Sequence, residues 1–90
     1  MNEIFERFLQ RVTLHLQRYC PSEFRAHAQK EVYRITAPLF NERPKKTELE
    51  AMNEIVHYLH DAFPDYRDKL FKMERLCEKK AVQESEEETK

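Results

Sequence analysis

Three residues in the stretch NEIVHYLHDAF, residues 53–63, have types and spacing that could hold a metal ion. Glu54 stands three residues before His57, and His60 follows three residues later. Some helical bundles bind a pair of metal ions through Glu-x-x-His, but they need two such helices and two further glutamates, all projecting inward. At 100° per residue, Glu54 and His57 fall on the polar side of their helix. They are weak metal candidates, and we expect no cofactor in the single chain; a metal-dependent site formed across a dimer is a third interpretation of function.

A second group of residues that could take part in binding lies within residues 1–20. Arg7, Arg11 and Arg18 fall within about 40° of one another on a helical wheel, Leu14 lies beside them, and His15 borders both this face and the apolar one. Arginine pairs with carboxylates and stacks on planar groups, and arginine next to an apolar side chain is typical of interaction surfaces. We therefore expect Arg7, Arg11, Leu14 and Arg18 to bind a partner. The alternative is that the arginines only solvate an outer face.

Nucleic acid is the other class of partner that this basic face could take, because clustered cations release counterions from phosphates. The chain has a net charge of −1 and a pI of about 6.4, and no series of aromatic residues accompanies the arginines. We therefore expect a protein–protein interaction module, such as an adaptor, regulator or inhibitor of a larger protein. A nucleic-acid-binding accessory protein that uses the basic face of the first helix is the alternative.

The composition argues against catalysis. Glycine is absent from all 90 residues, which excludes glycine-rich phosphate loops and nucleophile elbows, because both need glycine's backbone freedom. Cys20, beside Pro21, would be a nucleophile only if a histidine approached it in space. A buried thiol at the end of a helix is the simpler interpretation, and we predict that the protein is not an enzyme.

The cysteines and the N-terminal residues predict where the protein works. Cys20 and Cys77 are the two cysteines, and they form neither a Cys-x-x-Cys pair nor a disulfide framework. Residues 1–10 lack the layout of a signal peptide, and no apolar run approaches the ~20 residues that span a bilayer. We expect a cytoplasmic protein with free thiols and no membrane partner.

Four helical segments, separated by breaks that contain proline, must position these residues. In each segment apolar residues recur at intervals of three and four, as on one buried helix face. The first segment covers residues 2–19, the second runs from residue 22 to Ala37 or Phe40, and the others cover residues 47–63 and 65–82. Thr47 followed by Glu50 is a capping box at the start of the third segment. Ser22 and Asp65 are the expected N-caps of the second and fourth segments.

The second segment carries an additional apolar stripe. Ala26, Tyr33, Ala37 and Phe40 lie well round the cylinder from the stripe expected to face the core. One interpretation is that they face an adjacent helix of the same chain. The other is a homodimer contact, because alternating small and large residues suit a self-complementary two-fold interface.

Short connections between helices of similar length favour antiparallel neighbours. We therefore predict an all-α fold, an antiparallel up-and-down four-helix bundle, with a three-helix core and a loosely packed C-terminal helix as the alternative. A single helical domain is expected over residues 1–83. The acidic residues 84–90, ESEEETK, are expected to be a disordered tail, because such a sequence buries too little apolar surface to become ordered.

Overall fold

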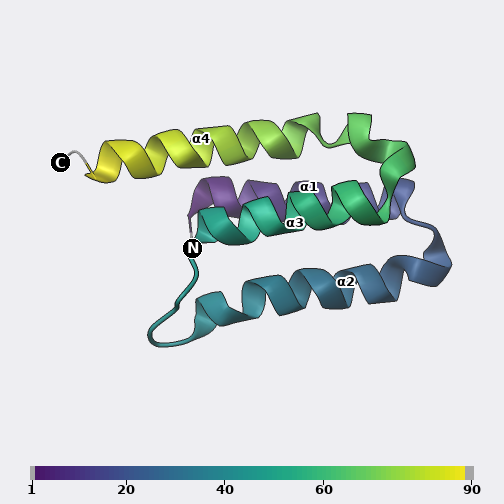
Figure 1. Cartoon of the computed structure of the whole chain (residues 1–90), viewed down its shortest axis with the longest axis horizontal. Coiled ribbons are helices and arrows are strands. Elements are labelled where there is room, and N and C mark those ends of the chain that lie inside the picture. Colours follow the sequence, from purple (N-terminus) through teal and green to yellow (C-terminus); the bar gives the residue numbers. More distant parts are fainter. Residues whose placement is uncertain (1, 89–90) are drawn as a thin grey trace.

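The computed structural model describes residues 2–88, which contain four α-helices and two short 3-10 helices. They are α1 (Glu3–Tyr19), α2 (Ser22–Thr36), η1 (Ala37–Phe40), α3 (Glu48–Ala62), η2 (Pro64–Lys69) and α4 (Phe71–Glu88). Successive α-helices run in opposite directions along the long axis (Figure 1). The predicted all-α, antiparallel up-and-down bundle is confirmed.

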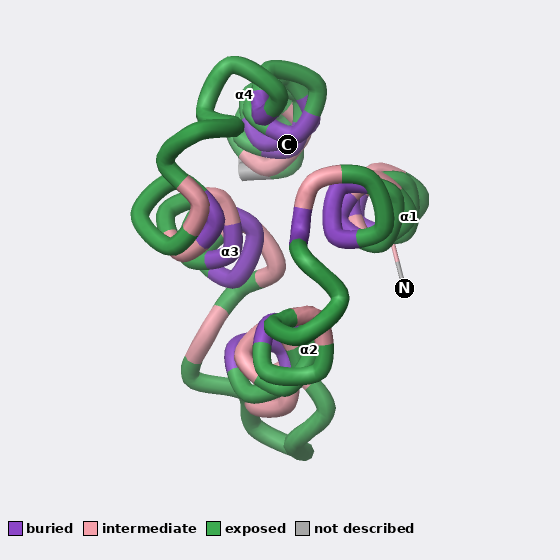
Figure 2. Tube along the Cα trace, turned by 90° about the vertical axis from the view of Figure 1, so that its right-hand side faces the viewer, coloured by how far each residue is buried: buried purple, intermediate pink, exposed green. Residues whose placement is uncertain are grey.

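The helices surround one apolar core. Seen end-on, α1 and α3 lie on opposite sides, with α4 above them and α2 below (Figure 2). α1 and α3 contact each other as well as both remaining helices. The largest fully buried side chains come from α1, α2 and α3 and from the residue just before α4: Phe5, Phe8, Ile35, Met52, Ile55, Leu59 and Leu70. Burying a side chain of this size stabilises a fold by roughly 1.5–3 kcal/mol.

The expected alternative, a loosely packed C-terminal helix, is wrong. The described part of α4 buries Met73, Leu76 and Cys77, and Leu70 just before it is fully buried. α2 is the least buried α-helix, with only Ala28, Ile35 and Thr36 inside. The reason is geometric, because α4 packs along α1 and α3 whereas most of α2 faces solvent (Figure 2).

Local hydrogen bonds explain where two of the helices begin. Asn2 caps α1, since its side-chain Oδ1 accepts from the backbone N–H of Ile4 at 2.8 Å and of Phe5 at 3.4 Å. The predicted cap at Thr47 is confirmed, because its hydroxyl oxygen accepts from the backbone N–H of Glu50 at 3.1 Å. Each bond satisfies a donor in the first turn that has no partner inside the helix.

The other two expected caps are wrong. Ser22 is the first residue of α2, Pro21 occupies the capping position, and no side chain caps this end. Asp65 lies in η2, and α4 begins only at Phe71. Pro64 starts the 3-10 turn, and Arg67 then donates from Nε to the carbonyl of His60 at 2.8 Å, which holds η2 against the end of α3.

The end of α1 is satisfied by a side chain from the next helix. Arg25 donates to three backbone carbonyls, those of Leu16, Gln17 and Cys20, each at 3.3 Å. These are carbonyls at the C-terminal end of α1, and that of Leu16 also accepts from the backbone N–H of Cys20 at 3.2 Å. Carbonyls in the last turn of a helix and at its C-cap are commonly satisfied by side chains. Arg25 therefore fixes the angle between α1 and α2.

A polar cluster closes the opposite end of the bundle. The ammonium of Lys80, which is buried, lies 3.0 Å from Oε1 of Glu48 on α3 and 3.4 Å from Oε1 of Gln83. Gln83 in turn accepts from Nδ2 of Asn2 at 2.8 Å. The cluster joins α1, α3 and α4 just before residues 84–90, which we call the acidic segment.

The helical conformation extends past the boundary expected at residue 83. α4 runs to Glu88, with Glu84 half-buried and 4.0 Å from Lys80, while residues 85–87 are exposed. Disorder of residues 84–90 in solution stays a prediction, and residues 89–90 lie outside the described part. None of the helices in residues 2–88 combines the length and apolar character that crossing a bilayer requires.

A candidate binding site: the basic groove between the first and fourth helices

The metal candidates on α3 lie on its outer side. Glu54 forms an ion pair with Lys46 at 3.0 Å, and His57 Nε2 lies 3.2 Å from Oδ2 of Asp61. Nδ1 of His60 lies 3.2 Å from Oδ1 of the same aspartate, and this contact is the main reason why the pKa of Asp61 is lowered. Within residues 2–88 no group of three or more histidine, cysteine, aspartate or glutamate side chains is arranged to hold a metal ion.

Neither thiol has the surroundings of a nucleophile. Cys20 and Cys77 are free and buried. Burial raises the pKa of Cys20, although Arg25 opposes the shift, and burial raises the pKa of Cys77 to about 11. Because the thiolate is the reactive species, both groups are poorly reactive at neutral pH.

The second apolar stripe of α2 does not face another helix of the chain. Tyr33 is 72% exposed and Phe40 66% exposed, Ala26 is exposed, and Ala37 is half-buried. The interpretation that these four residues contact an adjacent helix is therefore wrong. α2 has only one buried side, so the stripe is left on the surface.

The partner-binding residues predicted on α1 lie together at a groove. Arg7 and Arg18 are exposed, Arg11 is half-buried, and Leu14 is 37% exposed. Two adjoining hollows of about 240 Å³ and 320 Å³ lie between α1 and the chain from Lys69 onward, and both are lined by Arg11 and Leu14.

The opposite wall of the groove carries a second row of cations. Lys69 ends η2, and Lys72, Arg75 and Lys79 follow on α4 at intervals of three or four, so that they share one side of the helix. We call this feature the basic groove and define its cations as Arg7, Arg11, Arg18, Lys69, Lys72, Arg75 and Lys79.

The positive charge of the basic groove is largely uncompensated. No carboxylate lines either hollow. Among the described residues, Lys69 forms a long contact of 3.8 Å with Asp68, and none of the other six cations forms an ion pair. Like charges in two facing rows repel one another, and an anion placed between them relieves that repulsion.

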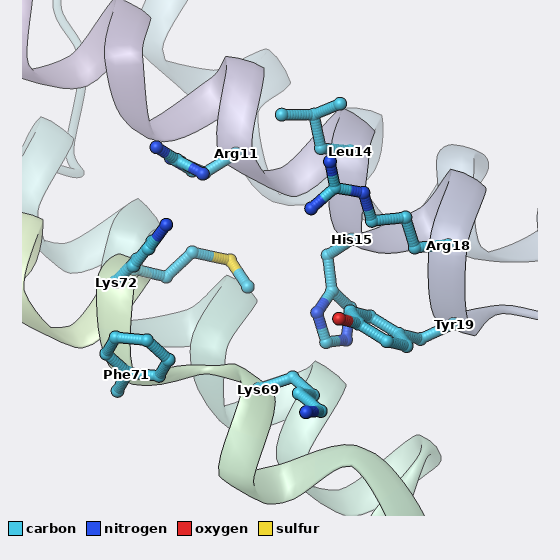
Figure 3. Close-up of a pocket in the computed structure, with 9 residues that line it drawn as sticks. Arg11, Leu14, His15, Arg18, Tyr19, Lys69, Phe71 and Lys72 are labelled. Atoms are coloured by element: carbon cyan, nitrogen blue, oxygen red, sulfur yellow. The ribbon is translucent and has the colours of Figure 1, made fainter.

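A buried histidine lies at one end of the groove. His15 is 4% exposed, and its Nδ1 has no hydrogen-bond partner among the described residues. Its ring packs at 5.0 Å, centroid to centroid, from that of Tyr19. Burial lowers the pKa of His15, so the ring is neutral at pH 7. The imidazole extends from α1 toward Lys69 and lies beside the ring of Tyr19 (Figure 3), and Arg11, Arg18, Lys69 and Lys72 line the same hollow.

We call the smaller hollow, which His15 lines, the His15 pocket. Arg11 and Arg18 reach it from α1, and Lys69 and Lys72 reach it from the other wall (Figure 3). Phe71 also lines it and is 51% exposed. Four cations, one neutral imidazole and apolar surface make this arrangement suited to binding an anion that carries an apolar part.

Half of this site was not expected from the sequence. The helical wheel predicted the part of the site that lies on α1. The spacing of Lys72, Arg75 and Lys79 does not indicate which helix packs beside α4. The fact that these residues share one side of a helix was available, and it was the one signal that could have drawn attention to them. The burial of His15 depends on α4 covering it, which only the packed structure shows.

Comparisons of the chain with protein-family models, with curated proteins and with solved structures found no significant match.

Proposed function

We propose that the protein is a non-enzymatic interaction module that docks an acidic segment of a larger protein in the basic groove. The observation that carries this proposal is the pair of facing cation rows without a lining carboxylate. A partner that supplies carboxylates would satisfy these cations, and its charge would also steer the encounter.

The length of the groove suits a short helical or extended segment. Arg7 and Arg18 are eleven residues apart on α1, which corresponds to about 16 Å along a helix axis. Leu14 lies between them and is partly exposed. An apolar side chain inside a charged rim is a common arrangement of binding anchors, because the apolar contact excludes water around it. An acidic partner segment with one or two apolar residues would match both features.

Charge reversal on one wall tests the proposal. Arg7→Glu with Arg11→Glu is expected to weaken binding of the partner by slowing association, and high salt is expected to have the same effect. Lys30→Glu with Arg43→Glu is the matched control, since both residues are exposed on or after α2 and the change in charge is the same. Affinity purification with these chains as baits, followed by binding kinetics with the recovered partner, provides the measurement.

Both double variants should keep the helix content and melting temperature of the wild type, because isolated surface substitutions usually change stability by under ~0.5 kcal/mol. If the α1 variant binds the partner as fast as the control at low salt, the cations of the basic groove only solvate the surface and the proposal is wrong.

Nucleic acid is the second candidate, and the row of cations on α4 is the observation that favours it. Two lines of cations could follow a phosphate backbone. The expected signature is binding to generic single or double strands that falls steeply and linearly with the logarithm of salt concentration. Recovery of an acidic protein in the affinity purification, together with no binding to single or double strands, would exclude nucleic acid as the partner.

We also propose that α2 and η1 together provide a homodimer contact through Ala26, Tyr33, Ala37 and Phe40. The exposure of Tyr33 and Phe40 supports it. Sedimentation of the wild type should show a concentration-dependent dimer, and Tyr33→Asp with Phe40→Asp should abolish it. Phe24→Asp is the control, because Phe24 is 53% exposed and lies outside this stripe. A wild type that stays monomeric at high concentration would contradict the proposal.

The cytoplasm is the compartment that we propose. Both cysteines are free although two thiols could in principle pair, and disulfides form chiefly in oxidising compartments. Fractionation of cells that express a tagged chain would test this assignment.

A further inference from the structure

We propose that the His15 pocket binds a phosphate dianion, either inorganic phosphate or a phosphomonoester, through the cations at its rim and a hydrogen bond from the imidazole of His15. This proposal goes beyond the docking of an acidic segment, because it concerns one end of the basic groove and does not depend on what occupies the rest.

The unpaired imidazole is the first argument. Roughly 90% or more of buried polar groups in proteins have a hydrogen-bond partner, yet Nδ1 of His15 has none among the described residues and the side chain is 4% exposed. A leucine at this position would avoid that penalty. His15 lines the hollow between α1 and the start of α4 (Figure 3), so a bound anion would lie beside the ring and accept its N–H once Nδ1, which is shielded from solvent, is turned toward it.

The surrounding charge is the second argument. Arg11, Arg18, Lys69 and Lys72 line the pocket together with His15, and no acidic residue lines it. A single carboxylate would leave most of this charge uncompensated, whereas a phosphate dianion offers three oxygens to guanidinium and ammonium donors. Phosphate groups are bound by such clusters of basic side chains in other recognition domains.

The size of the hollow is the third argument. Its volume is about 240 Å³, below the roughly 300–1,000 Å³ of pockets that enclose drug-sized ligands. A phosphoryl group fits such a space more readily than a whole nucleotide does. Phe71 and Leu14 border the hollow and are partly exposed, so they can contact the group that carries the phosphate.

The test is an NMR titration of the full chain at pH 7.5, in which the ring signals of His15 are followed. Inorganic phosphate and a phosphoserine peptide are the probes; dimethyl phosphate and the unphosphorylated peptide are the controls. We expect saturable shifts at His15 with the two dianions and none with the controls. A response to both dianions indicates a site for free phosphate, and a response to the phosphopeptide alone indicates a site for a modified protein; either supports the proposal.

Variants separate the two parts of the pocket. His15→Leu and, separately, Arg11→Gln with Lys72→Gln are each expected to weaken phosphate binding by about tenfold or more, since hydrogen bonds that involve a charged group contribute on that order. His15→Asn, which keeps a donor near the position of Nδ1, should retain part of the affinity. Lys30→Gln with Arg43→Gln removes the same charge elsewhere and should change affinity by less than about twofold.

Melting temperatures distinguish a role of His15 in binding from a role in folding. Without phosphate, His15→Leu should melt at or above the temperature of the wild type, because an unpaired buried group has been removed. At the same concentration, phosphate should raise the melting temperature of the wild type clearly more than that of His15→Leu.

Several results would overturn the proposal. One is equal binding of phosphate by His15→Leu and the wild type. Another is an equal response to dimethyl phosphate, or tighter binding of an oligonucleotide than of either dianion, since the groove would then recognise phosphodiesters. Failure of the wild type to bind any acidic partner, with phosphate binding intact, would instead count only against the docking proposal.

Discussion

At the residue scale, His15 shows how one side chain can link stability to binding. Helical periodicity places it at the border between the core side of α1 and the arginine side. Packing of α4 then buries it without a partner for Nδ1. A protein selected only for stability would gain from an apolar residue here. The proposed contact with an anion would give this unfavourable placement a role in binding.

The buried histidine leads to a prediction about pH. Burial lowers the pKa of His15 in the folded chain below the value near 6.5 of the unfolded chain. Between these two values the unfolded state binds more protons, so the free energy of unfolding falls as pH decreases below about 6.5 and the loss is complete below the folded pKa. The charged side chains that line the hollow beside His15 are those of Arg11, Arg18, Lys69 and Lys72.

Urea unfolding of the wild type and of His15→Leu between pH 7.5 and 5 checks this prediction. The variant lacks the ring of His15, so its free energy of unfolding should fall less than that of the wild type across that range. His27, His57 and His60 are present in both chains, so they do not account for a difference between them. Parallel curves would mean that His15 does not titrate differently in the folded and unfolded states.

At the element scale, the helix patterns predicted more than the connections did. The apolar residues of α1 and α3 recur at the expected spacing, and Phe5, Phe8, Ile55 and Leu59 are buried as that spacing requires. Residues 65–69 were expected to be part of the fourth helix and belong instead to the 3-10 helix Pro64–Lys69. Proline and a capping residue mark the start of any helical turn, and they do not distinguish a 3-10 turn from an α-helix.

Thr47 allows a test of the cap that the sequence did predict. Thr47→Ala removes the acceptor for the backbone N–H of Glu50 and should lower the free energy of unfolding by about 1 kcal/mol. Thr47→Ser keeps the hydroxyl and should cost much less. Chemical denaturation of both variants gives the comparison, and equal losses would show that the cap is unimportant.

The last turns of α4 carry the second prediction at this scale. Four glutamates lie in residues 84–88. Negative charge at a helix C-terminus opposes the helix dipole, and like charges three or four residues apart repel one another. We expect backbone order parameters from NMR to fall beyond Glu84, where contacts with Lys80 end. Uniformly high values through Glu88 would contradict the disordered tail.

At the scale of the whole molecule, charge is segregated although the net charge is only −1. The basic groove holds seven cations, and the acidic segment follows it directly on α4 (Figure 1). Local potential, more than net charge, determines how an anionic partner approaches. The acidic segment should therefore act on the end of the groove that it adjoins.

Distance sets how far that influence extends. Lys79 lies five residues before Glu84, about 7.5 Å along the axis of α4, whereas Lys72 at the His15 pocket lies twelve residues before it, about 18 Å away. The screening length at physiological salt is about 8 Å. Repulsion by the acidic segment therefore reaches Lys79 and is screened at the His15 pocket.

Removal of residues 84–90 tests this difference. The deletion takes away four glutamates and one lysine, so the net charge changes from −1 to +2. Association with an acidic partner should become faster at low salt, with little change in dissociation, whereas phosphate affinity at the His15 pocket should change by less than about twofold. Replacing the four glutamates by glutamine in the full-length chain is the matched control and should reproduce the faster association. If association is unchanged at low salt in both chains, the acidic segment does not influence docking. If phosphate affinity rises as much as the association rate, its charge acts over the whole groove and the screening argument is wrong.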